Sequence, residues 1–170
     1  MLKTPIEWKA FSLEHVNLPD DGDPDELWAT AAERVGLLPL AAFTWARARE
    51  DDSLRKVQQA IFEARHVGRE KVGSPDVLER VLSSAGVDGP AVVSELTSDR
   101  RWLDEARADH EEAVSLGIFG VPTLLFPGCG AMFVRLTAIP EGDDVARVFE
   151  RVRQACADPL VDELKRPKPK

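Results

Sequence analysis

The feature that most constrains this sequence is a long series of helix signals that lies between two stretches of β-like pattern. Apolar residues recur at helical spacing from about residue 24 to residue 116, and turn residues or capping pairs such as Ser74-Pro75 divide this stretch into separate helices. Before it, residues 6–13 alternate between apolar and polar side chains, which predicts a half-buried strand with a bulge. The predicted fold class is therefore α/β with an all-helical insertion, mostly helical by content.

The pattern changes after Gly117. Residues 120–126 form a short apolar run rich in β-prone side chains, a Pro-Gly-Cys-Gly turn follows, and residues 132–136 form a second run, which together predict a hairpin. Six helices are predicted before the hairpin, starting near residues 24, 40, 54, 75, 90 and 99. One more is predicted after it, with an apolar stripe made of Val145, Val148, Phe149, Val152 and Cys156.

This order divides the chain into four segments. Residues 1–24 and 99–160 are predicted to form the two parts of one sheet-containing domain, and residues 25–98 the helical insertion between them. Residues 161–170 are basic and rich in proline, which predicts a flexible tail.

Charge and hydropathy exclude several classes of partner. Among 170 residues, Lys plus Arg is 22 and Asp plus Glu is 30, a net charge of −8 that disfavours binding to a phosphate backbone. We therefore expect no nucleic-acid partner. No apolar run has the length of a membrane span, and the N-terminus lacks an apolar signal core, so we expect a cytoplasmic protein without a membrane partner.

The residues that carry chemistry are few. Cys129 and Cys156 do not form a Cys-x-x-Cys motif, and His15, His66 and His110 lack zinc-like spacing, so no metal site is predicted. The sequence also has no glycine-rich phosphate loop, no Gly-x-Ser-x-Gly elbow and no His-Glu-x-x-His motif. These absences disfavour a zinc enzyme, a mononucleotide kinase and an α/β-hydrolase.

Three strings resemble the DsbA family of thioredoxin-fold thiol–disulfide oxidoreductases, which is related to 2-hydroxychromene-2-carboxylate isomerases and kappa-class glutathione transferases. They are Ile6-Glu7-Trp8-Lys9-Ala10-Phe11-Ser12-Leu13-Glu14, the stretch from Ala60-Ile61-Phe62 to Val72-Gly73-Ser74-Pro75-Asp76-Val77-Leu78, and Glu112-Ala113-Val114-Ser115-Leu116-Gly117-Ile118-Phe119-Gly120-Val121-Pro122-Thr123. The resemblance covers nearly the whole chain and implies a thioredoxin-like fold with a helical insertion.

The resemblance also implies a substrate loop. Val121 and Pro122 match the loop whose proline is cis in the family, and Val121, Pro122 and Thr123 are the substrate-binding residues that it implies. In the family, the backbone of the residue before the proline pairs with an extended segment, as a strand adds to a sheet edge. The implied partners are a protein or peptide thiol or disulfide, or glutathione, with no other cofactor.

The sequence departs from the family at its beginning. The family has a strand and a helix before the segment that matches residues 6–14, and that helix carries the dithiol or, in the isomerase and kappa-class branches, a serine. We therefore expect no catalytic residue in this chain and no dithiol oxidase activity. Three accounts stay open: the polypeptide starts further upstream, another chain supplies the strand, or the fold is remodelled.

Three functions follow, and the sequence does not decide among them. The first is a thiol–disulfide oxidoreductase of the DsbA family. The second is the glutathione-binding, isomerase-like branch. The third is a non-catalytic peptide-binding or dimerisation module, and an uncovered sheet edge makes a homodimer a possible partner.

Several other residues allow two interpretations of their role. His110, on the inward face of the helix before the loop, is either a proton shuttle or a buried, hydrogen-bonded histidine. His66, near two arginines, is either an anion contact or part of a solvated helix end. Cys129 is expected to be a small turn residue rather than a reactive thiol, and Cys156 a buried structural thiol. The tryptophans are expected in the core: Trp8, Trp28, Trp45 and Trp102.

Overall fold

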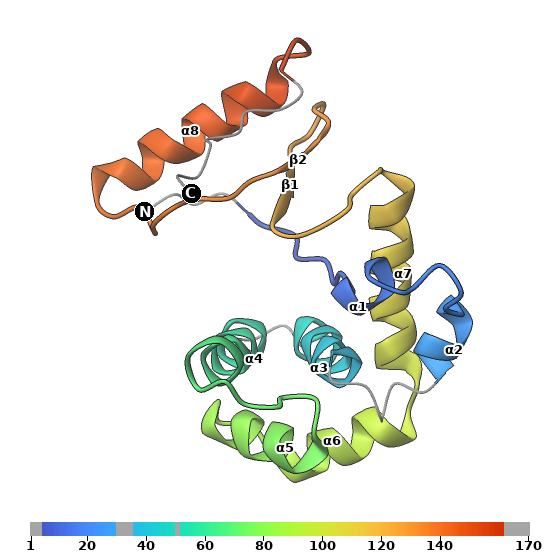
Figure 1. Ribbon diagram of the computed structural model, residues 1–170. Helices are drawn as coiled ribbons and strands as arrows, with labels where there is room; N and C mark the ends of the chain where they lie inside the picture. The colour runs from blue at the N-terminus through green and yellow to red at the C-terminus, as the bar shows by residue number, and fades with distance from the viewer. Residues whose placement is uncertain (1–4, 30–35, 50–51, 162–170) are drawn as a thin grey trace. The chain divides into compact units, whose positions relative to one another are not determined.

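The structure is a computed structural model that describes residues 5–29, 36–49 and 52–161 (Figure 1). It divides into two compact units. One runs from Glu7 to Ser115, and the other contains residues 5–6 and the described residues from Leu116 onward. The first unit is helical and the second contains the hairpin, and each is described by itself.

The first unit is built from helices whose ends follow local sequence signals. Asp23 accepts hydrogen bonds from the backbone of Asp25 (2.8 Å) and Glu26 (3.4 Å), and Asp88 accepts one from Ala91 (3.1 Å), so both act as helix caps. The elements are α1 (Leu13–Val16), α2 (Pro24–Ala29), α3 (Leu37–Arg47), α4 (Ser53–Phe62), the π-helical continuation η2 (Glu63–Val67), α5 (Pro75–Ser84), α6 (Gly89–Ser98) and α7 (Arg101–Ser115).

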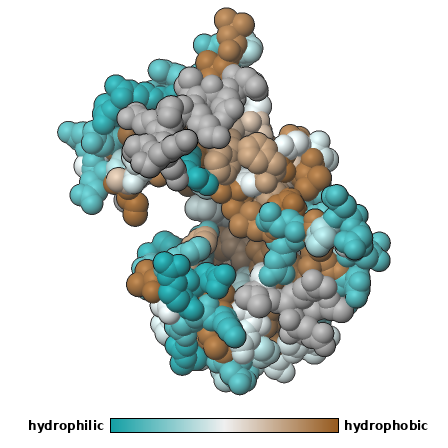
Figure 2. All heavy atoms as spheres, in the orientation of Figure 1, coloured by the Kyte–Doolittle hydropathy of each residue, from teal (hydrophilic) through white to brown (hydrophobic). Residues whose placement is uncertain are grey.

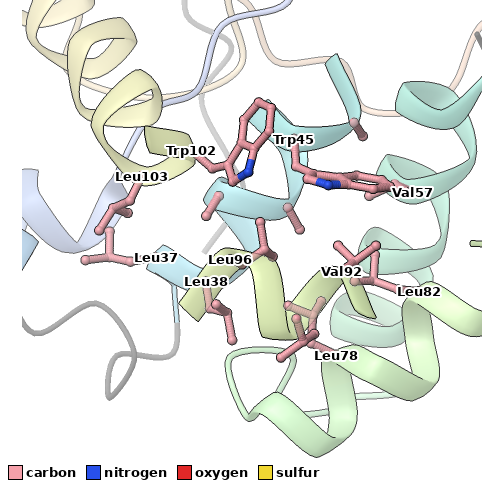
Figure 3. Packing of buried hydrophobic residues seen from close by; sticks show 14 of the residues in the cluster. Leu37, Leu38, Trp45, Val57, Leu78, Leu82, Val92, Leu96, Trp102 and Leu103 are labelled. Carbon is pink, nitrogen blue, oxygen red and sulfur yellow. The ribbon is translucent and has the colours of Figure 1, made fainter. Parts of the chain in front are cut away.

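The core of this unit lies around α3, which packs against α4, α6 and α7, while α5 packs against α4 and α6. Leucine, valine and tryptophan side chains from these helices meet there (Figure 3). The indole N–H groups of Trp45 and Trp102 both donate to the carboxylate of Glu95, at 3.1 and 2.9 Å. Each large apolar ring is thus buried without leaving its polar edge unsatisfied.

The second unit contains a two-stranded antiparallel sheet, β1 (Thr123–Leu125) and β2 (Ala131–Phe133), followed by α8 (Asp143–Ala157). In the register, Leu124 lies opposite Met132. The rings of Phe126 and Phe149 pack edge to face with their centroids 5.7 Å apart, which joins the hairpin to α8. The predicted hairpin and the predicted last helix are confirmed.

The predicted strand at residues 6–13 is wrong. Residues 5–12 belong to no strand, and residues 13–16 form α1, which Ser12 caps by accepting from the backbone N–H of His15 (3.1 Å). Two backbone N–H groups of this segment donate to side chains of α7 instead. Ala10 N–H donates to Asp109 (2.8 Å) and Ser12 N–H donates to His110 Nδ1 (3.3 Å), so no neighbouring strand is needed.

Three tryptophans are buried as predicted, but Trp8 is 43% exposed, because its segment is not aligned in a sheet. The helix predicted to start near residue 40 begins at Leu37, and the helix after Asp88 is longer than predicted. The predicted helix that begins at Pro24 is observed to Ala29, and its continuation over residues 30–35 lies outside the described residues, as does the predicted tail beyond residue 161.

Within the described ranges, no helix combines the length and the apolar composition needed to cross a bilayer.

Candidate functional site

The loop that precedes β1 holds the three residues for which a substrate-binding role is predicted. The peptide bond between Val121 and Pro122 is cis. The carbonyl oxygen of Pro122 accepts a hydrogen bond from Val134 N–H (2.9 Å), and Thr123 Oγ1 donates to the Gly120 carbonyl (2.7 Å). The structure therefore places Val121, Pro122 and Thr123 together, at the end of β1 and within one unit.

The direction of the Pro122 carbonyl determines which backbone groups of β1 are free. In an antiparallel pair, successive residues of a strand direct their N–H and C=O groups to opposite sides. Because the Pro122 carbonyl faces β2, the backbone groups of Thr123 and Leu125 face the other side, and Val121 precedes the strand across the cis peptide bond. In the sheet that the described residues form, β1 has no second neighbour, so this side is an open edge.

The unit that contains this edge also exposes several large apolar side chains. Phe119 and Phe133 pack with ring centroids 5.6 Å apart. Figure 2 shows hydrophobic residues in brown at several places on the face that it draws. In the second unit, the exposed large hydrophobic side chains of the loop, the hairpin and the residues that follow are Leu116, Phe119, Val121, Leu124, Leu125, Leu136 and Ile139. An open strand edge with exposed apolar side chains is suited to an extended peptide.

His110 belongs to the other unit and is fully buried on α7. Its Nδ1 accepts from Ser12 N–H, and the rings of Phe11, His15 and Trp28 lie around it, with centroids 4.8, 4.4 and 5.8 Å from its own. Its Nε2 has no hydrogen-bond partner among the described residues. Burial, and secondarily the charge of His15, lower the pKa of His110 from 6.5 to about 4, so the imidazole is neutral at pH 7.

Stability is expected to fall as the pH decreases from about 6.5 to about 4. The unfolded chain binds a proton at His110 near its ordinary pKa, whereas the folded chain binds one only near pH 4, so protonation favours unfolding. The stabilisation is complete above pH 6.5, and its loss amounts to ~3 kcal/mol at most by pH 4. Urea unfolding measured across this range checks the prediction.

The matched variants are His110→Asn and His66→Asn. An asparagine at 110 keeps an acceptor for Ser12 N–H but does not titrate, so its stability should depend less on pH than that of the wild type. His66 is exposed, so its variant should keep the wild-type profile. An unchanged pH dependence in His110→Asn would refute the assignment.

His66 lies on η2, exposed, with its ring stacked on Phe62 at a centroid distance of 5.7 Å. Arg65 lies on the same element, and Arg69 follows it with a positive φ of 57°. This cluster belongs to the helical unit, as His110 does, and neither lies in the unit that holds residues 121–123. The anion-contact role of His66 stays a prediction.

The sequence analysis missed a buried charged cluster centred on Asp109. Its carboxylate accepts from Ala10 N–H (2.8 Å), is paired with Arg47 and lies 3.6 Å from Lys9 Nζ. Arg47 also donates to the Trp8 carbonyl (2.9 Å). The members come from three distant parts of the chain, so no local motif indicates them. Within the described residues, no group of three or more ligating side chains is arranged to hold a metal ion.

Comparison with known proteins gives two findings. A family model described as the DSBA-like thioredoxin domain matches residues 27–148. The uncharacterized protein Rv2286c of Mycobacterium tuberculosis is 31% identical over 169 residues, which cover 96% of this chain and 69% of that protein.

Proposed function

Because the chain belongs to the DSBA-like thioredoxin family, we propose that it binds an extended segment of a thiol- or disulfide-bearing protein or peptide along Val121–Thr123 and the open edge of β1. This family is of the thiol–disulfide oxidoreductase type. The proposed contact is the addition of a strand to a sheet edge.

The observation that carries the proposal is the direction of the backbone. The Pro122 carbonyl is used by Val134 N–H, so the N–H and C=O groups of Thr123 and Leu125, the alternate residues of β1, face away from β2. No backbone hydrogen bond joins Val121 to another described residue. An extended peptide can supply donors and acceptors for these groups in alternation, as a neighbouring strand does.

A peptide fits this edge better than glutathione does. The open edge of β1 runs from Thr123 to Leu125, which is about 10 Å of extended chain, and Val121 lies just before it. Val121 and Leu125 are 45% and 56% exposed, so apolar side chains accompany the free backbone groups. Glutathione has a single standard peptide bond and can engage only part of such an edge. We keep glutathione, and a second copy of the chain, as alternative occupants to be tested.

The proposal assigns binding to these residues and names no nucleophile. The sequence contains no Cys-x-x-Cys motif, so the two-thiol chemistry of the family's active-site helix is not encoded in these 170 residues. The isomerase-like branch would likewise need a serine outside the matching segments. The contribution of this chain to exchange chemistry is then to hold the backbone of the substrate.

Val121→Pro is expected to weaken binding of an extended cysteine-containing peptide about tenfold. Proline removes the N–H of residue 121, and one lost backbone hydrogen bond that costs about 1.4 kcal/mol lowers the affinity about tenfold. Titration calorimetry of the full chain with the peptide and, separately, with glutathione measures the effect.

Val121→Ala is the matched control, because it trims the side chain and keeps the N–H. Its affinity for the peptide should stay within about threefold of the wild type, since the valine is half exposed. Near-ultraviolet circular dichroism should show that both variants keep the wild-type fold. The proposal fails if the wild type binds no peptide, or if Val121→Pro binds as tightly as Val121→Ala.

A further inference from the structure

The two cysteines, far apart in sequence, belong to the same compact unit. Cys129 lies in the turn between β1 and β2, where it is half-buried, and Cys156 lies in the last turn of α8, where it is buried. Both are free thiols. Neither has a role in the peptide edge, so the pair calls for a separate explanation.

A ring contact joins the start of the turn to the face of α8 that carries Cys156. Cys129 N–H donates to the Phe126 carbonyl (3.0 Å), which closes a β-turn and keeps the two Cα atoms within about 7 Å of each other. Phe126 packs on Phe149. Phe149 and Cys156 are seven residues apart, so they lie on one face of α8 two turns apart. In the view of Figure 1, the hairpin turn is drawn on the same side of the unit as the C-terminal end of α8.

Electrostatic coupling between the residues agrees with this placement. Burial raises the pKa of the Cys156 thiol above its usual value, and the charge of Cys129 raises it further. The pKa of Arg153 is raised mainly by its hydrogen bonds to Glu150, and the charge of Cys129 contributes too. Arg153 and Cys156 are neighbours on α8, so the charge of Cys129 affects the pKa of two groups in the same region of the helix.

The glycines on both sides of Cys129 are not packed against other parts of the chain. Gly128 has a positive φ of 77°, and no atom lies within 4 Å of the position that a Cβ would occupy at either Gly128 or Gly130. A disulfide needs its two Cα atoms about 4.4–6.8 Å apart. A bond between the two sulfurs therefore requires the turn to reach that separation from α8, and packing at these two glycines does not oppose it.

We propose that Cys129 and Cys156 form a reversible intramolecular disulfide by exchange with a low-molecular-weight disulfide such as glutathione disulfide. The thiolate of Cys129, the more accessible sulfur, attacks one sulfur of the small disulfide. The S–S bond breaks, and one thiolate leaves with the electron pair. Cys156 then loses its proton to solvent and attacks the Cys129 sulfur, which releases the second small thiolate. Two protein thiols are oxidised and one disulfide is reduced to two thiols.

The bond would tie the hairpin to a helix that is otherwise weakly anchored. Cys156 is the one residue of α8, which is described in full, that is buried. Linking positions 129 and 156 restricts the unfolded chain, so the oxidised protein is expected to melt about 5 °C or more above the reduced protein.

The experiment equilibrates the full chain with mixtures of reduced and oxidised glutathione and then traps free thiols with an alkylating reagent. In the wild type, the thiol count should fall from two to zero, with a mass loss of two hydrogen atoms. Trypsin should release residues 108–135 joined to residues 154–165. The folded chain should form this bond at a ratio of oxidised to reduced glutathione about tenfold lower than the urea-unfolded chain, because folding holds the thiols together.

Two single variants test the order of the steps. Cys156→Ser should accumulate a mixed disulfide between Cys129 and glutathione, whereas Cys129→Ser should stay reduced while folded, because Cys156 is buried. Three outcomes would overturn the proposal. They are a glutathione adduct that persists on the wild type, a disulfide between two chains in place of the internal one, and equal oxidation of the folded and unfolded chains.

Discussion

Replacing Asp109 with alanine is expected to lower the free energy of unfolding by about 3–5 kcal/mol. The side chain is 7% exposed, and it satisfies Ala10 N–H and neutralises Arg47 while Lys9 lies nearby. Removing the carboxylate leaves a buried N–H without an acceptor and leaves Arg47, whose side chain is 25% exposed, with only the more distant carboxylate of Glu105 at 3.9 Å. Both losses act on the same segment, because Arg47 also donates a hydrogen bond to the Trp8 carbonyl.

Urea denaturation of the wild type and Asp109→Ala measures this loss. Asp104→Ala is the matched control on the same helix, because Asp104 pairs with Arg100 at 3.5 Å while both side chains are more than half exposed. Its loss should stay below about 0.5 kcal/mol. If Asp109→Ala lost less than about 1 kcal/mol, the cluster would not be what holds residues 7–12 to α7.

Gly89→Ala is expected to destabilise the helical unit by about 3 kcal/mol. A Cβ at this position would lie 1.9 Å from the backbone carbonyl oxygen of Glu79 and 2.5 Å from Ser83 Oγ. Gly89 is the first residue of α6, and Glu79 lies inside α5, so relief of the clash requires the two helices to separate. The leucine and valine side chains between them would then lose contact.

Gly130→Ala provides the comparison for a glycine that has room. No atom lies within 4 Å of its Cβ position, and its φ is not in the left-handed region, so its midpoint of thermal unfolding should stay within about 2 °C of the wild type. Gly89→Ala should lower the midpoint by about 10 °C or more. Equal midpoints for the two variants would contradict the close approach of α5 and α6.

The side chains of α7 explain how residues 7–12 pack without a neighbouring strand. Asp109 and His110 accept the N–H groups of Ala10 and Ser12, which a strand partner would otherwise satisfy. The geometry of this segment therefore does not depend on a sheet. Asp109→Ala and His110→Asn both test how residues 7–12 attach to α7. The first removes a charge, and the second removes a group that can be protonated.

Most helices could be predicted from the sequence because their signals are local. Asp23 and Asp88 cap the helices that follow them, and Pro75 occupies the first position of α5. The hairpin was predictable for the same reason, since a Pro-Gly-Cys-Gly turn between two apolar runs brings the runs together over a few residues. The family resemblance added the role of residues 121–123, which stays a proposal.

The sequence by itself determined most of the helices, the hairpin and the family, because each depends on residues close together in the chain or on short sequence motifs. The tertiary structure alone decided that residues 7–12 attach to α7, that the Pro122 carbonyl pairs with Val134, and that Phe126, just before the turn that holds Cys129, packs on Phe149 of α8. The physical reason is that hydrogen-bond and ring partners 12 to 99 positions apart are selected by packing. No spacing in the sequence encodes which of them meet.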